Sequence, residues 1–284
     1  MKLLVFGQTG QVARALARLA PDAVFLGRDQ ADLTDPAACA RAILAARPDA
    51  VINAAAYTAV DKAETDEATA HLVNALAPEA MARACAEVGV PLVHISTDYV
   101  FDGAGDSAFL PTDPVAPLGA YGRTKAEGEA RLRATGATHG ILRTSWVFSP
   151  DGSNFVKTML RLSETRDRLT VVGDQVGGPT PAAAIAQACL TIADRLREGP
   201  ALSGSYHFSG APDTSWAGFA RAIFELSGRK VEVVDIPTAD YPTPARRPLN
   251  SRLDCTTTEA TFGLARPDWR AGLRDALSDL KVLA

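Results

Sequence analysis

The sequence predicts an α/β protein built on a Rossmann-type, doubly wound parallel sheet, with a smaller C-terminal part. Three observations lead to this fold class. Short apolar runs of strand length alternate with longer runs of helix length through the first half of the chain. A glycine-rich turn joins the first strand to the first helix. A tyrosine and a lysine, four residues apart, begin a later helix.

Composition narrows the class of protein. The chain has 284 residues, of which 47% are hydrophobic, enough for the core of one large domain or two. A net charge of −4 argues against general affinity for nucleic acid or acidic lipid. The apolar run at the N-terminus is too short for a signal peptide, and no transmembrane run follows, so a cytoplasmic location is expected. Neither a zinc site nor a disulfide framework is indicated by the scattered Cys39, Cys85, Cys189 and Cys255.

The first strand and the turn after it suggest a phosphate site. Residues 2–6 are predicted as a buried strand and 14–19 as a helical run. Between them, Gly7, Gly10 and Ala13 give the spacing Gly-x-x-Gly-x-x-Ala. This order places backbone N–H groups and a helix N-terminus against a pyrophosphate. The alternative is an ordinary turn with no ligand.

The following elements are expected to continue the alternation. We predict strands at 23–26, 50–56, 91–96 and 140–144, and helices at 36–46, 67–88 and after residue 121. The C-terminal ends of parallel strands meet at one edge of a sheet, where such folds bind ligands. The alanines at 54–56 leave room there for a flat ring system, although close packing explains them equally well. Further strands are expected at 204–210 and 231–236, and helices at 216–226 and 269–283.

The tyrosine and lysine at the helix start are candidates for acid–base chemistry. Tyr121 and Lys125 follow a proline-containing segment that cannot stay helical, and their spacing puts both on one helix face. An adjacent ammonium would favour the phenolate and lower the pKa of Tyr121 from about 10 towards neutrality. The alternative is an exposed tyrosine beside a solvated lysine.

Taken together, these motifs resemble those of extended short-chain dehydrogenases/reductases: the glycine-rich turn, a Thr after the fourth strand and the Tyr-x-x-x-Lys sequence. Within that superfamily, the chain is similar to the dTDP-4-dehydrorhamnose reductase family. The segments that carry this resemblance are 96–101, 121–125, 143–148, 154–159, 174–180 and 241–248, so it covers nearly the whole chain.

The resemblance implies NAD(P)H-dependent reduction of the 4-keto group of dTDP-4-dehydro-L-rhamnose, giving dTDP-L-rhamnose. Arg28 after the second strand leads us to expect that NADPH is preferred and NADH tolerated. The resemblance also implies two interleaved domains. The dinucleotide-binding domain would comprise residues 1–149 plus about 176–200. The sugar-nucleotide-binding domain would comprise about 150–175 and 201–284.

The family's functional residues can be carried onto matching positions. Tyr121 would protonate the ketone oxygen, Lys125 would bind the nicotinamide ribose and lower the Tyr121 pKa, and Thr97 would polarise the ketone. The alternative for Thr97 is a hydroxyl that satisfies backbone groups. Tyr121 and Lys125 would also contact the cofactor, and the other expected cofactor-binding residues are Gly7, Thr9, Gly10, Gln11, Val12, Arg28, Asp32, Leu33, Ala54, Ala55 and Ala56.

Arg28 follows the second strand, where it could pair with the 2′-phosphate of NADPH or point into solvent. The substrate set is Thr97, Asp98, Tyr99, Trp146, Asn154, Arg246 and Arg247, with Arg252 nearby. Trp146 could instead be a core aromatic residue, Asn154 a helix cap, and the arginines part of a solvated loop.

Two departures from relatives shape the remaining expectations. Some relatives dimerise through a metal held by an acidic residue on the first helix; residues 12–16 lack a carboxylate here, so no metal is expected, and a homodimer stays open. Related dehydratases carry a glutamate base where this chain has Tyr99, so dTDP-glucose should not be converted. The alternatives are a non-catalytic, nucleotide-binding regulatory subunit and a related sugar-nucleotide reductase or epimerase.

Overall fold

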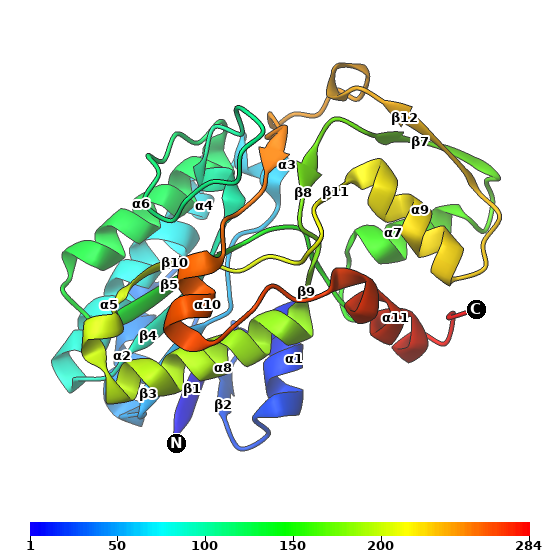
Figure 1. Ribbon diagram of the computed structural model, residues 1–284. Helices are drawn as coiled ribbons and strands as arrows, with labels where there is room; N and C mark the ends of the chain where they lie inside the picture. The colour runs from blue at the N-terminus through cyan, green and yellow to red at the C-terminus, as the bar shows by residue number, and fades with distance from the viewer.

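A six-stranded parallel sheet organises most of the chain in the computed structural model, which describes residues 1–284 (Figure 1). Its spatial order is β10-β5-β4-β3-β1-β2. From β1 the chain adds β2 on one side and then β3, β4, β5 and β10 on the other, so the strand order reverses between β1 and β3. Ligands of doubly wound sheets bind at this reversal, beyond the C-terminal ends of the strands. The strands are β1 (Leu3–Phe6), β2 (Val24–Leu26), β3 (Ala50–Asn53), β4 (Leu92–Thr97), β5 (His139–Thr144) and β10 (Gly204–His207).

Helices cover both faces of this sheet. Alternate residues of each strand enter different cores: in β1, Leu3 and Val5 pack with α1 and α8, while Leu4 and Phe6 pack with α2 and α5. This two-sided burial explains why the strands are continuous apolar runs, and it confirms the predicted doubly wound fold. The helices concerned are α1 (Gln11–Leu19), α2 (Pro36–Ala46), α5 (Ala77–Val88), α6 (Ala120–Ala134) and α8 (Ala182–Glu198).

The single helix predicted at 67–88 is divided. It consists of α4 (Glu67–His71), a π-helical turn η1 (Leu72–Leu76) and α5. Pro78 has no N–H for the carbonyl of Asn74, and the wider turn accommodates that missing hydrogen bond. The Asn74 carbonyl lies instead against α6, where a Cβ added to Gly128 would be 2.0 Å from it. The interrupted helix therefore lets α6 approach closely.

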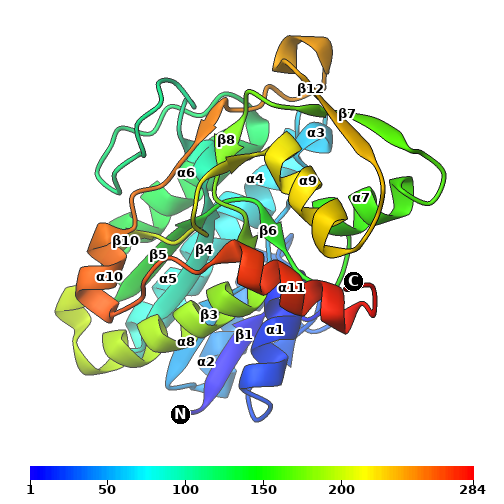
Figure 2. The ribbon, with the colours of Figure 1, turned by 45° about the vertical axis from the view of Figure 1, so that its right-hand side comes forward.

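A second, smaller part with its own core lies at the right in Figure 1 and in the foreground of Figure 2. A parallel pair, β7 (Arg168–Val172) and β12 (Glu232–Ile236), packs with α7 (Phe155–Leu162), α9 (Trp216–Leu226) and α11 (Trp269–Asp279).

Short elements occur in both parts. They are β6 (Val147–Phe148), β8 (Val176–Gly177), β9 (Thr180–Pro181), β11 (Thr214–Ser215), β13 (Asn250–Ser251), α3 (Val60–Ala63), α10 (Thr256–Phe262), and the 3-10 turns η2 (Asp98–Val100), η3 (Pro200–Leu202) and η4 (Thr238–Asp240).

The chain crosses between the two parts several times. It leaves the large sheet after β5, returns through α8 and β10, and leaves again. The strand predicted at 204–210 ends at His207 and pairs with β5, so it belongs to the large sheet and not to the C-terminal region where the expected boundary at 201 placed it. Two other predicted elements are shorter: the strand at 50–56 ends at Asn53, and the helix at 269–283 ends at Asp279.

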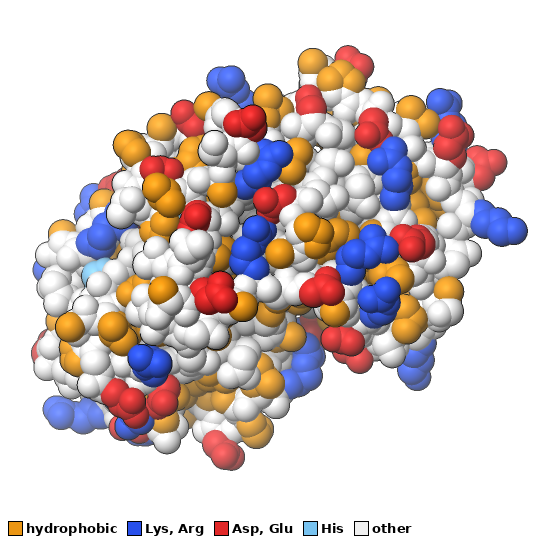
Figure 3. Space-filling model, in the orientation of Figure 1, with side chains coloured by type: hydrophobic (Ala, Val, Ile, Leu, Met, Phe, Trp, Pro, Cys, Tyr) orange, Lys and Arg blue, Asp and Glu red, His pale blue; other side chains and the backbone are white.

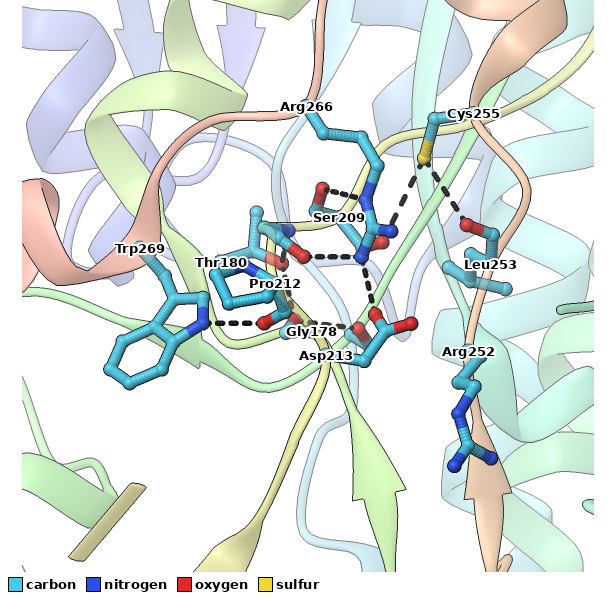
Figure 4. A network of polar contacts seen from close by, with 12 residues as sticks. Gly178, Thr180, Ser209, Pro212, Asp213, Arg252, Leu253, Cys255, Arg266 and Trp269 are labelled. Atoms are coloured by element: carbon cyan, nitrogen blue, oxygen red, sulfur yellow. Dashed lines mark hydrogen bonds and ion pairs between the residues drawn. The ribbon is translucent and has the colours of Figure 1, made fainter. Parts of the chain in front are cut away.

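Arg266 joins the crossing segments (Figure 4). Its guanidinium donates to the carbonyl oxygens of Ser209, at 3.2 Å, and of Gly210, and pairs with Asp213. Beside it, the indole of Trp269 donates to the Pro212 carbonyl at 2.6 Å. These bonds fix the start of α11 to the segment that leaves β10.

The molecular surface carries mixed charge. Figure 3 shows acidic and basic side chains interspersed over the face of Figure 1, without a large patch of one sign. No helix has both the length and the apolar character needed to cross a bilayer.

Candidate active site

The glycine-rich turn lies at the reversal of the sheet. Gly7 has a φ of +108°, which side-chain-bearing residues rarely adopt, and an added Cβ would be 3.2 Å from the backbone carbon of Ala54. The turn therefore lies directly against the segment 54–56, as the predicted cofactor site requires. Gly10 precedes the first turn of α1, and Val12 is buried beneath it.

The residues after β2 differ in exposure. The side chain of Arg28 is 84% exposed and lies 3.9 Å from Asp32, so the guanidinium is free to reach an anion. Asp32 accepts a hydrogen bond from the backbone N–H of Thr34 at 2.9 Å, while Leu33 is buried. Arg28 and Asp32 thus lie at the edge of the candidate cofactor site.

Thr97 ends β4 and begins a bend stabilised by its own side chain. Its hydroxyl donates to Asp98 at 3.0 Å and accepts from the backbone N–H of Tyr99 at 3.2 Å. The local hydrogen bonding that was the alternative explanation for Thr97 is therefore present, and it also fixes the hydroxyl in place. Burial raises the pKa of Asp98 to about 6.

Tyr121 and Lys125 lie on one face of α6, next to this bend. The ring of Tyr121 meets that of Tyr99 edge-on, with 5.4 Å between centroids. Lys125 is buried, and its Nζ donates to the Ile95 carbonyl at 2.7 Å and lies 3.0 Å from Nε2 of His94. Thr97, Tyr121 and Lys125 come together because α6 packs against the end of β4.

The predicted lowering of the Tyr121 pKa is wrong. Burial raises that pKa above its usual range, and the nearby hydroxyl of Thr97 only partly opposes the effect. Burial also lowers the pKa of Lys125 to about 8, and its nitrogen bonds to β4 instead of to the phenol. Desolvation, which the sequence pattern does not reveal, outweighs the helical spacing.

A glycine determines how closely α6 approaches β4. A Cβ added to Gly122 would be 2.2 Å from the carbonyl oxygen of Tyr99, so only glycine fits there. At the same helix end, the backbone N–H of Ala120 donates to Glu64 at 2.9 Å. The hydroxyl of Thr124 donates to the Tyr121 carbonyl at 3.0 Å.

A buried ion pair supports the strand ends beneath the site. Glu129 of α6 accepts two hydrogen bonds from Arg143 of β5, at 2.7 and 2.9 Å, and one from Ser96 at 2.6 Å. Burial alone would raise the pKa of Glu129, but the hydrogen bonds and charge of Arg143 lower it overall. The pair links α6, β4 and β5.

A cleft of about 650 Å³ opens beside Tyr99. It runs between the two parts of the molecule, and its lining includes Tyr99, Phe155, Trp216, Arg166, Arg168 and Arg247. Arg247 donates to the Tyr99 hydroxyl at 3.2 Å and to Asp61 at 2.7 Å, whereas Arg246 is exposed. Residues 242–249 form no helix or strand, as the prolines predicted. Tyr121 does not line this cleft, but its ring contacts Tyr99, which does.

Trp146 and Asn154 have structural roles in this region. Trp146 stacks on Trp216 with 3.7 Å between ring centroids, and it has a φ of +49°. Asn154 caps α7 by accepting from the Lys157 N–H at 3.2 Å, and its amide donates to Gln11 at 2.9 Å. These contacts favour the helix-cap explanation of Asn154 and give Gln11 a part in joining the two halves of the molecule.

Several residues of the site had no sequence signal. Asp61 lies 186 positions from Arg247, and no spacing rule connects them. Phe155, Arg168 and Trp216 belong to ordinary helix and strand patterns, and Arg166 lies in the loop between α7 and β7. His94 lies inside a predicted buried strand, where a polar residue among apolar ones was the only available sign.

The family model described as RmlD substrate binding domain matches residues 1–282. A dTDP-4-dehydrorhamnose reductase of Sinorhizobium fredii is 47% identical, over 96% of both chains. A crystal structure of a dTDP-4-dehydrorhamnose reductase from Clostridium acetobutylicum is 37% identical, with a TM-score of 0.92, over 99% of this chain and 100% of that one. A Bacillus anthracis dTDP-4-dehydrorhamnose reductase, in complex with NADP, is 33% identical, with a TM-score of 0.91, over 98% and 100% of the two chains.

The Glu129–Arg143 pair predicts a pH-dependent stability defect. Arg143→Met should lower the free energy of unfolding by about 3–5 kcal/mol near pH 8, because it leaves a buried carboxylate unpaired. In the wild type, the low Glu129 pKa means that the pair stabilises the fold above the unfolded-state pKa and loses that effect as pH falls through the folded-state value. In the variant, Glu129 is buried without Arg143, so its pKa should rise. The loss of unfolding free energy should therefore shrink as pH falls and Glu129 is protonated.

Urea unfolding at pH 8 and pH 5.5 measures this difference. Arg133→Met is the matched control, since Arg133 is partly exposed and also pairs with Glu129, at 3.2 Å. It should lose only about 0–1 kcal/mol. Equal, pH-independent losses in the two variants would contradict the interpretation.

Proposed function

The chain belongs to the RmlD substrate binding domain family, whose members compared above are dTDP-4-dehydrorhamnose reductases, and from that premise we propose which residues carry out its reaction. The reaction is the NADPH-dependent reduction of the 4-keto group of dTDP-4-dehydro-L-rhamnose to dTDP-L-rhamnose. The observation that carries the assignment is the meeting of Thr97, Tyr121 and Lys125 at the C-terminal end of β4, on the same edge of the parallel sheet as the turn at Gly7.

Tyr121 is the proton donor. Its burial keeps the phenol protonated at neutral pH, which suits a group that must give a proton to the ketone oxygen. The hydroxyl of Thr97 donates to Asp98 in the free protein, and on substrate binding it would turn this single proton to the ketone oxygen and hold that oxygen towards Tyr121, while still accepting from the Tyr99 N–H. Lys125, anchored on the Ile95 carbonyl, stabilises the phenolate that remains after proton transfer.

The cofactor site is formed by the turn at Gly7, the alanines at 54–56 and the edge residues Arg28 and Asp32. The close approach of Gly7 to Ala54 makes a narrow backbone cradle, and the small side chains that follow β3 leave space above it. Bound NADPH supplies the hydride. The backbone N–H groups at the start of α1 bind its pyrophosphate, and Arg28 binds its 2′-phosphate.

The cleft beside Tyr99 takes the sugar nucleotide. Phe155 and Trp216 offer aromatic faces for the base and sugar, with Trp146 stacked behind Trp216, and Arg166, Arg168 and Arg247 offer cations for the diphosphate. Tyr99 contacts both the cleft and Tyr121, so a nucleotide held there would present its sugar to the proton donor.

The division of labour follows the two parts of the molecule. Residues 1–149, with about 176–207, hold the cofactor, and about 150–175 and 208–284 hold the sugar nucleotide. The upper limit of the returning segment is moved from the expected 200 to include β10, because this strand pairs with β5. A regulatory subunit that binds nucleotide without turnover is disfavoured by the complete Thr97, Tyr121 and Lys125 arrangement.

Tyr121→Phe tests the proton donor. The change removes only a hydroxyl, so NADPH affinity should stay within about twofold, while NADPH oxidation with dTDP-4-dehydro-L-rhamnose should slow more than about 100-fold, or roughly 3 kcal/mol. The matched control is Tyr206→Phe, which deletes a hydroxyl bound to the Leu202 carbonyl away from the site. It should leave kcat unchanged. Near-normal turnover by Tyr121→Phe would remove the phenol from the mechanism.

Arg28→Ala tests the choice of cofactor. The KM for NADPH should rise about tenfold, equivalent to about 1.4 kcal/mol, because a phosphate contact is lost, and the KM for NADH should not change. Arg41→Ala is the control, since Arg41 is an exposed arginine of α2 that pairs with Asp35. If the variant changes the kinetics of both cofactors equally, Arg28 does not read the 2′-phosphate.

A further inference from the structure

Lys125 is held from beneath by two buried side chains to which the reaction described above gives no role. The Nζ of Lys125 lies 3.0 Å from Nε2 of His94, and Nδ1 of the same ring lies 3.0 Å from the amide nitrogen of Asn53. All three side chains are nearly inaccessible to solvent, with exposed fractions of 0–1%. This run of hydrogen-bonded side chains leads from β3 through β4 to α6, under the candidate cofactor site.

The orientation of Asn53 determines where the imidazole carries its proton. The Oδ1 of Asn53 accepts a hydrogen bond from the backbone N–H of Ala55 at 3.1 Å, so its NH2 group faces His94. That NH2 can only donate, and Nδ1 of His94 must therefore accept. A neutral imidazole that accepts at Nδ1 has its single proton on Nε2, the nitrogen that faces Lys125.

With its proton on Nε2, the ring of His94 can donate to the amine form of Lys125 but cannot accept from the ammonium form. An ammonium group and an Nε2–H would be two donors pointing at each other, whereas an amine can accept from Nε2–H and still donate to the Ile95 carbonyl at 2.7 Å. To bind the ammonium, the imidazole proton must move to Nδ1. Asn53 must then rotate, and the N–H of Ala55 loses its acceptor.

The other charged and titratable groups near Lys125 do not override the preference that His94 and Asn53 give to its amine form. On α6, Glu129 favours the ammonium form of Lys125, but its own charge is paired with Arg143 of β5 at 2.7 Å. Tyr121, on the same helix, stays protonated because burial raises its pKa. Burial and the charge of Lys125 lower the pKa of His94 well below 6.5, which leaves the imidazole neutral. Burial lowers the pKa of Lys125 to about 8.

We propose that His94, oriented by Asn53, is a positioning residue that fixes the Nζ of Lys125 at the end of β4 and favours its amine form. The proposal rests on the role given to Lys125 in the proposed function. It implies that the tautomer of His94 and the charge of Lys125 change together: the Nε2–H tautomer accompanies the amine, and the Nδ1–H tautomer accompanies the ammonium.

The tautomer of His94 can be measured without any substrate. The chain has four histidines, so ¹⁵N-histidine labelling with His94→Gln as the assignment variant identifies the His94 ring signals. At pH 9.5 the Nε2 signal should be that of a protonated nitrogen and the Nδ1 signal that of an acceptor. A Nδ1–H tautomer at this pH would mean that Lys125 still donates to the ring, and it would overturn the proposal.

The pH profile of turnover provides the functional test. Because the ammonium stabilises the phenolate, kcat should fall as pH rises through the Lys125 pKa. His94→Gln offers an amide oxygen that accepts from the ammonium. Asn53→Asp keeps an acceptor for Ala55 and draws the ring proton to Nδ1, so Nε2 can accept from Lys125. Both variants should move the alkaline limb upward by about one pH unit or more.

His139→Gln is the control, because His139 is a buried histidine that bonds to the Ala137 carbonyl, away from Lys125. Its profile should coincide with that of the wild type. Profiles of His94→Gln and Asn53→Asp that also coincide with the wild type would refute a role for the pair in the charge of Lys125. If no dTDP-sugar were reduced at all, the proposed function would fail, and the tautomer at pH 9.5 would still decide the present inference.

Discussion

The close contact of α6 with the end of β4 and with η1 is the constraint on which the site depends. At Gly122 and Gly128 an added Cβ would come within 2.2 and 2.0 Å of the carbonyl oxygens of Tyr99 and Asn74. Only this approach brings Tyr121 to the bend that follows Thr97 and places Lys125 against Ile95. The π-helical turn at Leu72–Leu76, made necessary by Pro78, presents the carbonyl that α6 meets.

Burial, more than charge proximity, decides the chemistry of this site. Desolvation raises the pKa of Tyr121 and of Asp98 and lowers that of Lys125. A phenol that stays protonated suits a reductase, which needs an acid before it needs a base. Glu129 and Arg143 are the only buried charged groups beneath these strands that pair directly with each other. Their ion pair ties α6 to β5.

The sequence was sufficient for the first five strands of the large sheet and for bringing the proposed catalytic residues Thr97, Tyr121 and Lys125 to one strand end, because both depend on local patterns. Apolar runs located the strands, and the Gly7 turn and the Tyr121–Lys125 spacing located one crevice. Contacts between distant segments were not predictable: Asp61 with Arg247, His94 with Lys125, and β10 with β5. The direction of the Tyr121 pKa shift also failed, since helical spacing reveals neighbours but not how deeply a ring is buried.

The most direct test of the central claim is to follow NADPH oxidation and product together when the purified protein is given dTDP-4-dehydro-L-rhamnose. We expect one dTDP-L-rhamnose to form for each NADPH consumed, and no product from dTDP-glucose with NAD. Tight binding of NADPH and the keto sugar without turnover would indicate a regulatory subunit. A 4-keto-6-deoxy product from dTDP-glucose at enzymatic rates would show that the reaction is a dehydration. Either result would contradict the account.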